Sequence, residues 1–313
     1  MSQQSDPLAV VFVPEPQAMS EVSVVVVTHN SKQVFAKCIE ALLACREVKN
    51  IVVVDSASSE CRYLEEMRGR DARLKLICES SNVGFCRGNN IGYQAIRNGC
   101  GEFVLFLNPD AFVTPNLLEQ LIERMNRPDW ADVAACTPRL MGYSMTDDAP
   151  TGSVDSAGIG MTVYGKFFDR GQGSTDIAAY STSGEVQAIC GAFMLCRRHA
   201  LDAVSPKGEV FDERLYMYKE DIDLSLRLRR AGMRLMYCHD LAAYHCRGWR
   251  GSRREMPRWT IMQSLRNDWL VWRKFWFFLL PYSLALLFYL VAKSLVVAAE
   301  VWIFRGLLGQ GRK

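Results

Sequence analysis

The first part of the chain alternates short apolar runs with segments of helical spacing. Apolar, mostly β-branched runs occupy 22–27, 51–54, 73–78 and 103–107. Unbroken runs of this kind are typical of strands buried on both faces of a parallel sheet. Apolar residues recur with helical spacing at 34–43, 86–98 and 115–125. This order of strands and helices predicts an α/β fold with a doubly wound parallel sheet.

The second part of the chain is less regular. Residues 142–185 are rich in Gly, Ser, Thr and Asp, and we interpret them as loops or a small hairpin that forms a flap on the acceptor side. Further along, strand patterns occupy 186–195, 234–238 and 242–245, and helical patterns occupy 220–231 and 258–278. Gly232 is the expected C-terminal stop of the first of these helices.

Polar clusters follow the four predicted strands of the first part. They are Thr28-His29-Asn30, Asp55-Ser56, Asn82-Val83-Gly84 and Asn108-Pro109-Asp110. In open α/β sheets, ligands bind beyond the carboxyl ends of the strands. Four polar strand ends in succession therefore predict a binding site at this edge of the sheet.

Two of these clusters also have a local interpretation, and the residues alone leave both open. Asp55 is suited to cap the segment after it, which contributes roughly 1 kcal/mol, and equally to accept hydrogen bonds from a nucleoside. Asn108-Pro109-Asp110 consists of turn-forming residues, but Asp110 would also be able to hold a divalent cation through oxygen.

The glycines of segment 82–92 favour a close approach between backbone and ligand. Free N–H groups at the start of the following helix would suit phosphate. Their spacing, however, with only Gly84, Gly88 and Gly92, is not the GxGxxG of dinucleotide-binding folds.

Three carboxylates, Glu220, Asp221 and Asp223, lie at the start of a predicted helix, where the helix dipole favours negative charge. Asp223 and Arg227 form an i,i+4 pair, which indicates a structural role for Asp223. Glu220 and Asp221 remain available for proton or metal chemistry. The helix start should keep Asp221 ionised and ready to act as a base.

The order and spacing of seven segments carry a family resemblance. They are Val-Val-Val-Val-Thr-His-Asn (24–30), Val-Val-Asp-Ser-Ala-Ser (53–58), the glycine segment 82–92, Leu-Asn-Pro-Asp (107–110), Gly-Ala-Phe-Met-Leu (191–195), 211–224, and His245 with Gly248. Together they resemble the family 2 glycosyltransferases over residues 21–255. The resemblance is closest to the rhamnosyltransferase-like branch, which acts in bacterial O-antigen and exopolysaccharide assembly.

This resemblance implies a GT-A fold, which is a nucleotide-diphospho-sugar transferase fold with a Rossmann-like mixed sheet, and inversion at the anomeric carbon. It also implies a nucleotide-diphospho-sugar donor and a cofactor, Mg²⁺ or Mn²⁺. Carried over by position, the substrate-binding residues would be Thr28, Asn30, Asp55, Asn82, Gly84, Arg87, Asn89, Asn90, Asn108 and Gly191. Asp110 would bind the metal, with His245 near the metal or the diphosphate. Asp221 would be the general base, next to Glu220.

One position departs from the family pattern. The family's frequent Asp-x-Asp appears here as Asn108-Pro109-Asp110, so one carboxylate is missing. Metal binding is therefore expected to be weaker than usual or assisted by His245.

The implied reaction fits elementary chemistry, and the choice of substrate stays open. A carboxylate would remove the proton of an acceptor hydroxyl as it attacks the anomeric carbon, and a metal would offset the charge of the departing diphosphate. L-rhamnose from dTDP-rhamnose is the first expectation, with UDP- or GDP-hexoses as alternatives. The expected acceptor is a saccharide or a polyprenyl-diphosphate-linked molecule.

The sequence disfavours two other classes of protein. A dinucleotide oxidoreductase is disfavoured because GxGxxG is absent and the Glu220-Asp221 pair is present. A catalytically silent, membrane-docked assembly subunit that binds nucleotide sugars is disfavoured because the candidate residues are intact, namely Asp55, Asp110, Asp221 and His245.

Charge divides the chain into two unlike parts. Residues 1–228 carry 22 basic and 30 acidic side chains, a formal net charge of −8, whereas residues 229–313 carry 15 and 4, a net charge of +11. The basic part is interleaved with Trp and leads into 275–292, which has no charge and nearly the minimum length of a membrane span. Trp and Arg favour a membrane surface, while the acidic body and the apolar continuation argue against a nucleic-acid partner.

Several arrangements of the apolar segment 275–292 stay open. It would be able to span a bilayer, to lie in its interface, or to form an amphipathic helix packed on the catalytic domain or on a second copy of the chain. We therefore expect a flexible leader at 1–20, a GT-A catalytic domain at 21–255, and basic and hydrophobic membrane-associated helices at 256–313.

Cysteine content and targeting signals bear on the compartment. The chain has eleven cysteines, an odd number without a CxxC pair, which is typical of reduced thiols in the cytosol. Residues 1–20 lack the charged and apolar regions of a signal peptide. With a basic flank before the apolar segment, the catalytic domain is expected at the cytoplasmic face of a bacterial inner membrane.

Overall fold

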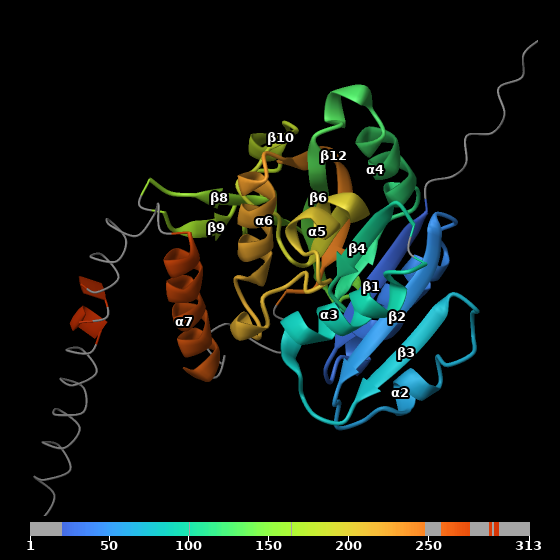
Figure 1. The fold of residues 1–313 in the computed structure, drawn as a ribbon. Coiled ribbons are helices and arrows are strands. Elements are labelled where there is room, and N and C mark those ends of the chain that lie inside the picture. The colour runs from blue at the N-terminus through green and yellow to red at the C-terminus, as the bar shows by residue number, and fades with distance from the viewer. Residues whose placement is uncertain are drawn as a thin grey trace, which may run out of the picture.

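The computed structural model describes residues 21–99, 101–163, 165–247, 258–275, 288–289 and 291–293. They form one mixed sheet with helices packed against it and a separate two-stranded sheet, β8–β9 (Figure 1). The expected leader at 1–20 and most of the apolar segment 275–292 lie outside the described residues.

The parallel half of the sheet forms where the apolar runs predict it. In spatial order its strands are β4 (Phe103–Leu107), β1 (Val22–Thr28), β2 (Val48–Ser56) and β3 (Leu74–Glu79), each parallel to its neighbour. Every residue of β1 and β4 is buried, which explains their unbroken apolar runs. The helices of this half are α1 (Lys32–Leu43), α2 (Arg62–Glu65) and α3 (Gly84–Ile96), whereas α4 (Leu117–Met125) packs on β6 and β12 of the other half.

The other half of the sheet makes it mixed, as the family resemblance implied. β11 (Phe193–Arg197) lies antiparallel between β4 and β6 (Val133–Ser144), and β12 (Arg234–His245) runs parallel to β6. The remaining strands are β5 (Ala111–Val113), β7 (Ala149–Ser156) and β10 (Gly184–Glu185). The order is β10-β12-β6-β11-β4-β1-β2-β3, with β5 on β12 and β7 on β6.

Three expectations for this half are refined. The patterns at 234–238 and 242–245 belong to a single strand, because the register shifts between Cys238 and Ala242 without ending β12. Within 186–195, the strand begins only at Phe193. The expected hairpin within 142–185 is confirmed as β8 (Ile159–Met161) and β9 (Phe167–Asp169), which follow β7.

The remaining helical segments lie around this second half. They are η1 (Pro128–Trp130), η2 (Ala178–Tyr180), α5 (Arg198–Val204), η3 (Glu213–Leu215), α6 (Glu220–Arg230) and α7 (Arg258–Lys274). Helix α6 confirms the predicted helix almost residue for residue. The ten cysteines that the structure describes are all free thiols, as expected.

Helix α7 packs on the catalytic domain, beside α6 and the β8–β9 hairpin (Figure 1). Its buried residues include Asn267 and Trp272, and the Trp272 ring lies 6.0 Å from the ring of Phe167 in β9. Helix α7, the described beginning of the region 256–313, thus packs on the catalytic domain, whereas the arrangement of 275–292, which lies mostly outside the described residues, stays a prediction. Within the ranges given above, no helix has the length and apolar character that crossing a membrane requires.

Candidate active site

Polar side chains join the loops that follow β1, β2 and β3. The Asn30 N–H donates to Ser58 Oγ (2.7 Å), and the Ser56 hydroxyl donates to Asn82 Oδ1 (3.0 Å). Asn82 Oδ1 also accepts from the N–H of Gly84 (3.0 Å). The carboxyl ends of these parallel strands thus bring the sequence-predicted polar residues together. We call Thr28, Asn30, Asp55, Asn82 and Gly84 the strand-end cluster.

Asp55 makes local contacts, but it does not cap the following helix, because α2 begins at Arg62 with Cys61 as its N-cap residue. Asp55 Oδ2 accepts from the N–H of Ser58 (3.0 Å), and the Ser58 hydroxyl donates to Oδ1, so the carboxylate closes the turn after β2. The residue is 1% exposed. Thr28, at the end of β1, is also buried, and its Oγ1 lies 3.2 Å from the Tyr63 hydroxyl. Their contact with a nucleoside stays a prediction.

The glycines of segment 82–92 serve mainly to bring α3 against its neighbours. A Cβ atom at Gly88 would lie 2.7 Å from Val27, and one at Gly92 would lie 2.3 Å from Val25 of β1. Gly84 has φ +76° and faces the Tyr216 ring, which a Cβ atom would meet at 2.4 Å. The expected approach of phosphate therefore does not explain Gly88 and Gly92, because close packing of helix on strand requires them.

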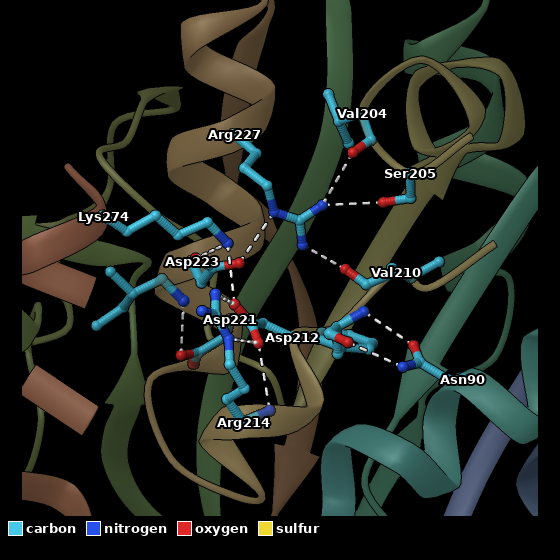
Figure 2. A network of polar contacts seen from close by, with 12 residues as sticks. Asn90, Val204, Ser205, Val210, Asp212, Arg214, Asp221, Asp223, Arg227 and Lys274 are labelled. Carbon is cyan, nitrogen blue, oxygen red and sulfur yellow. Dashed lines mark hydrogen bonds and ion pairs between the residues drawn. The ribbon is translucent and has the colours of Figure 1, made fainter. Parts of the chain in front are cut away.

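The two asparagines of this segment are turned into the protein. Asn90 donates to the carbonyl of Phe211 (2.8 Å) and accepts from its N–H (2.9 Å), and so fixes the loop before η3 to α3 (Figure 2). Asn89, buried, donates to the carbonyl of Phe85 (3.0 Å). Both amides thus make contacts within the protein, and their expected contact with substrate stays a prediction. Arg87 points outward and is exposed.

A row of alternating charges crosses the carboxyl ends of β4 and β12. His245 lies with Nε2 3.3 Å from Asp110 and with Nδ1 2.8 Å from Asp155 of β7. Arg247 continues the row, with Nε 2.6 Å from Asp155 and a terminal nitrogen 2.9 Å from Asp169 of β9. Hence five side chains from distant segments form one connected group.

The pKa values of this group follow from its mutual pairing. Burial alone would lower the pKa of His245, but Asp110 and Asp155 raise it to about 10. Burial would raise the pKa of Asp110 and of Asp155, yet His245 holds the pKa of each carboxyl below its ordinary value. The imidazole is therefore charged at neutral pH as long as both carboxylates face it.

The residues around Asp110 fit a divalent cation whose coordination is completed by other ligands. Asn108 Oδ1 is buried and has no hydrogen-bond partner among the described residues. With one Asp110 oxygen and His245 Nε2 it supplies oxygen and nitrogen donors, but no cluster of three His, Cys, Asp or Glu occurs in the described part of the chain. Mg²⁺ and similar ions commonly take only one or two carboxylates and complete their shell with substrate phosphates and water. Asp155, on Nδ1 of His245, is placed as metal-ligating histidines are usually oriented.

The start of α6 presents Glu220 and Asp221. Asp221 Oδ2 accepts from the N–H of Gly191 (2.9 Å), and Oδ1 accepts from the N–H of Ile222 (2.8 Å). Two backbone donors thus aim the carboxylate and leave further lone pairs on both oxygens. Asp223 pairs instead with Arg227 at 2.9 Å, which confirms its structural role (Figure 2).

Burial dominates the titration of these two carboxyls. It raises the pKa of Asp221, and the charge of Asp169 raises it further. Burial and the neighbouring Asp221 also raise the pKa of Glu220, to about 8. The helix start favours the ionised form of Asp221 and desolvation opposes it, so the expected ionised state of Asp221 stays a prediction. We call Asp110, Asp155, Asp169, Glu220, Asp221, His245 and Arg247 the charged centre.

Three members of the charged centre escaped the sequence analysis. Asp155 and Asp169 lie in the glycine- and serine-rich stretch that has no period, so nothing in their spacing marked them. Arg247 was grouped with the basic tail, although its position two residues after His245 at a strand end was a usable signal. Asp155 and Asp169 take part in long-range contacts, so only the folded chain shows these two residues.

Known proteins that resemble this chain in sequence are glycosyltransferases. The profile of the family described as "Glycosyltransferase like family 2" matches residues 16–262. Rhamnosyltransferase WbbL of Escherichia coli (strain K12) is 30% identical over 230 residues, which is 72% of this chain and 83% of that protein. An N-acetylglucosaminyl-diphospho-decaprenol L-rhamnosyltransferase of Mycobacterium tuberculosis is 24% identical over 246 residues, covering 71% of this chain and 75% of that protein.

A solved structure supports the fold. The crystal structure of GalNAc-T7 with UDP, GalNAc and Mn²⁺ superposes with a TM-score of 0.61 at 15% identity, over 82% of this chain. The chain spans about half of that structure, 48% of its length. At this identity the likeness concerns the fold alone, and it confirms the expected GT-A arrangement of the mixed sheet.

Proposed function

The chain belongs to glycosyltransferase family 2, and from that premise we propose that it transfers L-rhamnose from dTDP-L-rhamnose with inversion at the anomeric carbon. The observation that carries the proposal is the Asp221 carboxylate, held by the N–H groups of Gly191 and Ile222 at the carboxyl edge of the sheet. The donor choice is supported by the two rhamnosyltransferases that resemble this chain. A UDP- or GDP-hexose is the alternative donor.

Asp221 acts as the general base. One of its oxygens takes the proton of the acceptor hydroxyl while the hydroxyl oxygen bonds to the anomeric carbon, and the nucleoside diphosphate leaves from the opposite face. A carboxyl whose pKa burial has raised holds a proton better than an ordinary aspartate, so it is a more effective base near neutral pH. Glu220, with a pKa of about 8, stays protonated at neutral pH. It therefore places no negative charge next to Asp221.

The charged centre receives the diphosphate end of the donor. Asp110, Asn108 and His245 would hold a divalent cation, Mg²⁺ or Mn²⁺, which would offset the charge on the departing diphosphate. Binding through His245 Nε2 requires that this nitrogen lose its proton, so metal competes with protonation there. The strand-end cluster contacts the nucleoside, as its position beyond β1, β2 and β3 favours.

The exposed side chains of α7 favour the proposal that the acceptor is bound to a membrane. Trp259, Met262 and Trp269 are 53%, 64% and 48% exposed, and with the exposed Arg266 and Arg273 they recur at i, i+3 and i+4 spacing along one face. Trp together with Arg suits the interface of an anionic bilayer. We propose that this face rests on the cytoplasmic surface of the inner membrane and that the acceptor is a polyprenyl-diphosphate-linked saccharide.

A donor panel tests the function. The purified protein is incubated with dTDP-rhamnose and with UDP- and GDP-hexoses, each with Mg²⁺, Mn²⁺ or EDTA, and both the shift in Tm and nucleotide release are measured. We expect the largest shift and release with dTDP-rhamnose and metal. A larger response to a UDP- or GDP-hexose would replace the donor, and the absence of any response would contradict the transferase proposal for this chain.

A further inference from the structure

The segment that leads into the candidate base has an unusual backbone. Tyr216 has φ 59°, Tyr218 has φ 72° and Lys219 has φ 70°, although none of them is a glycine. Non-glycine residues in this region persist only where the surrounding structure holds them. Lys219 directly precedes Glu220 and Asp221, so whatever holds this segment also sets the position of the two carboxylates.

Helix α7 supplies the contacts that hold this segment. The side-chain amide of Asn267 is fully buried and donates toward three carbonyls: Leu215 (2.6 Å), Met217 (2.8 Å) and Tyr218 (2.8 Å). Gln263, one turn earlier, donates to the same Leu215 carbonyl (2.8 Å). These carbonyls belong to a stretch of backbone outside regular structure, and a single buried side chain of α7 donates to all three of them.

Ion pairs connect α7 to the same segment and to α6 at two further points. Lys219 lies 3.3 Å from Asp268 of α7. Lys274, at the end of α7, lies 2.6 Å from Asp223 of α6 and 3.2 Å from Asp212 before η3 (Figure 2). A cavity of about 230 Å³ remains between α7 and the segment around Leu215. Polar contacts rather than continuous apolar packing therefore join the two at this place.

We infer that Asn267 is a positioning residue for catalysis, through which α7 holds the strained segment 215–219 and so places Asp221 for proton removal. The inference rests on the proposed function, because it takes Asp221 as the base. It gives α7 a role in the active site in addition to the membrane contact that its composition indicates. The contact of Asn267 with the segment is structural, and its effect on the reaction passes through the position of α6.

Asn267→Asp tests the inference, because it keeps the size of the side chain and replaces two donors by an acceptor that faces three carbonyls. A misplacement of about 1 Å is able to cost about 100-fold in rate. We therefore expect kcat for nucleotide release to fall about 100-fold, with the donor KM and the dTDP affinity unchanged. The pH profile of kcat should also shift, since the surroundings of Asp221 would change.

Asn50→Asp is the matched control. Asn50 lies near the amino end of β2, whereas the candidate site lies at the carboxyl ends of the strands. Its side-chain amide donates to Ser23 Oγ (3.3 Å) and to the Gly99 carbonyl (3.4 Å). This variant should lose some thermal stability and keep both kcat and the pH profile. If Asn267→Asp does not fold, Asn267→Ala takes its place, because it leaves room for water to donate to the carbonyls.

The outcomes separate the inference from the function on which it rests. A wild-type protein that releases no nucleotide from any sugar nucleotide contradicts the proposed function. An active wild type with an Asn267 variant of unchanged kcat and pH profile overturns the inference. The inference is also overturned if kcat falls only in proportion to the fraction of folded protein at the assay temperature, as obtained from a thermal unfolding curve.

Discussion

The strand-end cluster and the charged centre lie at the same edge of the sheet, yet they are built differently. In the strand-end cluster, polar groups bond to groups in adjacent turns, as Asn30 does to Ser58. In the charged centre, ionisable groups meet across long stretches of chain, as His245 meets Asp110 and Asp155. The charged centre combines burial with shifted pKa values in His245, Glu220 and Asp221.

This difference matches the two proposed tasks, which are donor binding by the strand-end cluster and the transfer reaction in the charged centre. Turns after parallel strands place polar groups reliably, because the strands themselves are fixed by their buried runs. Proton transfer and charge stabilisation need groups taken out of water, and burying charge is tolerated only where partners from other elements surround it. We therefore expect mutations in the charged centre to change the reaction and mutations around the strand-end cluster to change stability or affinity.

Asp221→Asn should give the largest effect. It removes the base while keeping an oxygen for one of the two backbone donors, so we expect kcat to fall by about 100- to 10,000-fold. The affinity for dTDP, measured by calorimetry, should stay close to that of the wild type. Asp129→Asn, on η1 at an exposed site, is the control and should change neither value. Turnover retained in Asp221→Asn would remove Asp221 from its assigned role.

Asp155→Asn should weaken the use of metal. Without the carboxylate on Nδ1, His245 loses its orientation, and loss of such partners usually costs about 10- to 100-fold in metal affinity. The measurement is the Mn²⁺ concentration that gives half-maximal nucleotide release after removal of metal with EDTA. Asp169→Asn is the matched variant, because Asp169 contacts Arg247 but not His245. Equal metal requirements in both variants would show that His245 is not oriented through Asp155.

Glu220→Gln should change how stability depends on pH. The folded pKa of Glu220 is raised from 4.5 to about 8, so the proton stabilises the folded state, and this stability is lost as pH rises through that range. The loss is at most about 1.4 kcal/mol per pH unit for one proton. Glu220→Gln should therefore unfold with a flatter pH dependence between about 4.5 and 8 in denaturant titrations. The exposed Glu123→Gln on α4 should follow the wild-type curve.

Gly88→Ala should give the smallest effect on the reaction. The new Cβ atom would lie 2.7 Å from Val27, and such overpacking typically costs about 1–3 kcal/mol of unfolding free energy. The donor affinity of the folded protein should be unchanged. Gly99→Ala has nothing within 4 Å of its Cβ position and serves as the control. A selective loss of donor affinity in Gly88→Ala would favour the phosphate interpretation of this glycine and blur the contrast between the two regions.

The sequence by itself determined the parallel half of the sheet and the residues at its strand ends. β1 and β4 are buried throughout, so their runs of apolar residues specified strands regardless of the rest of the molecule. The helix start at Glu220 and the Asp223–Arg227 pair were also readable, because contacts between residues three or four apart are local. From the sequence, Asp55 was suited both to capping the next segment and to binding a nucleoside. The fold shows that its carboxylate closes the turn after β2.

The tertiary structure decided everything that depends on distant partners. β11 entered the sheet antiparallel between β4 and β6, and no local pattern records which strands become neighbours. Asp155 and Asp169 acquired their partners only when β7 and β9 met the end of β12. Desolvation, which raises the pKa of Asp221, is likewise a property of the surrounding packing. The greatest change of interpretation concerns α7, because its basic and apolar composition pointed to a membrane while its inner face, through Asn267, holds the backbone that precedes the candidate base.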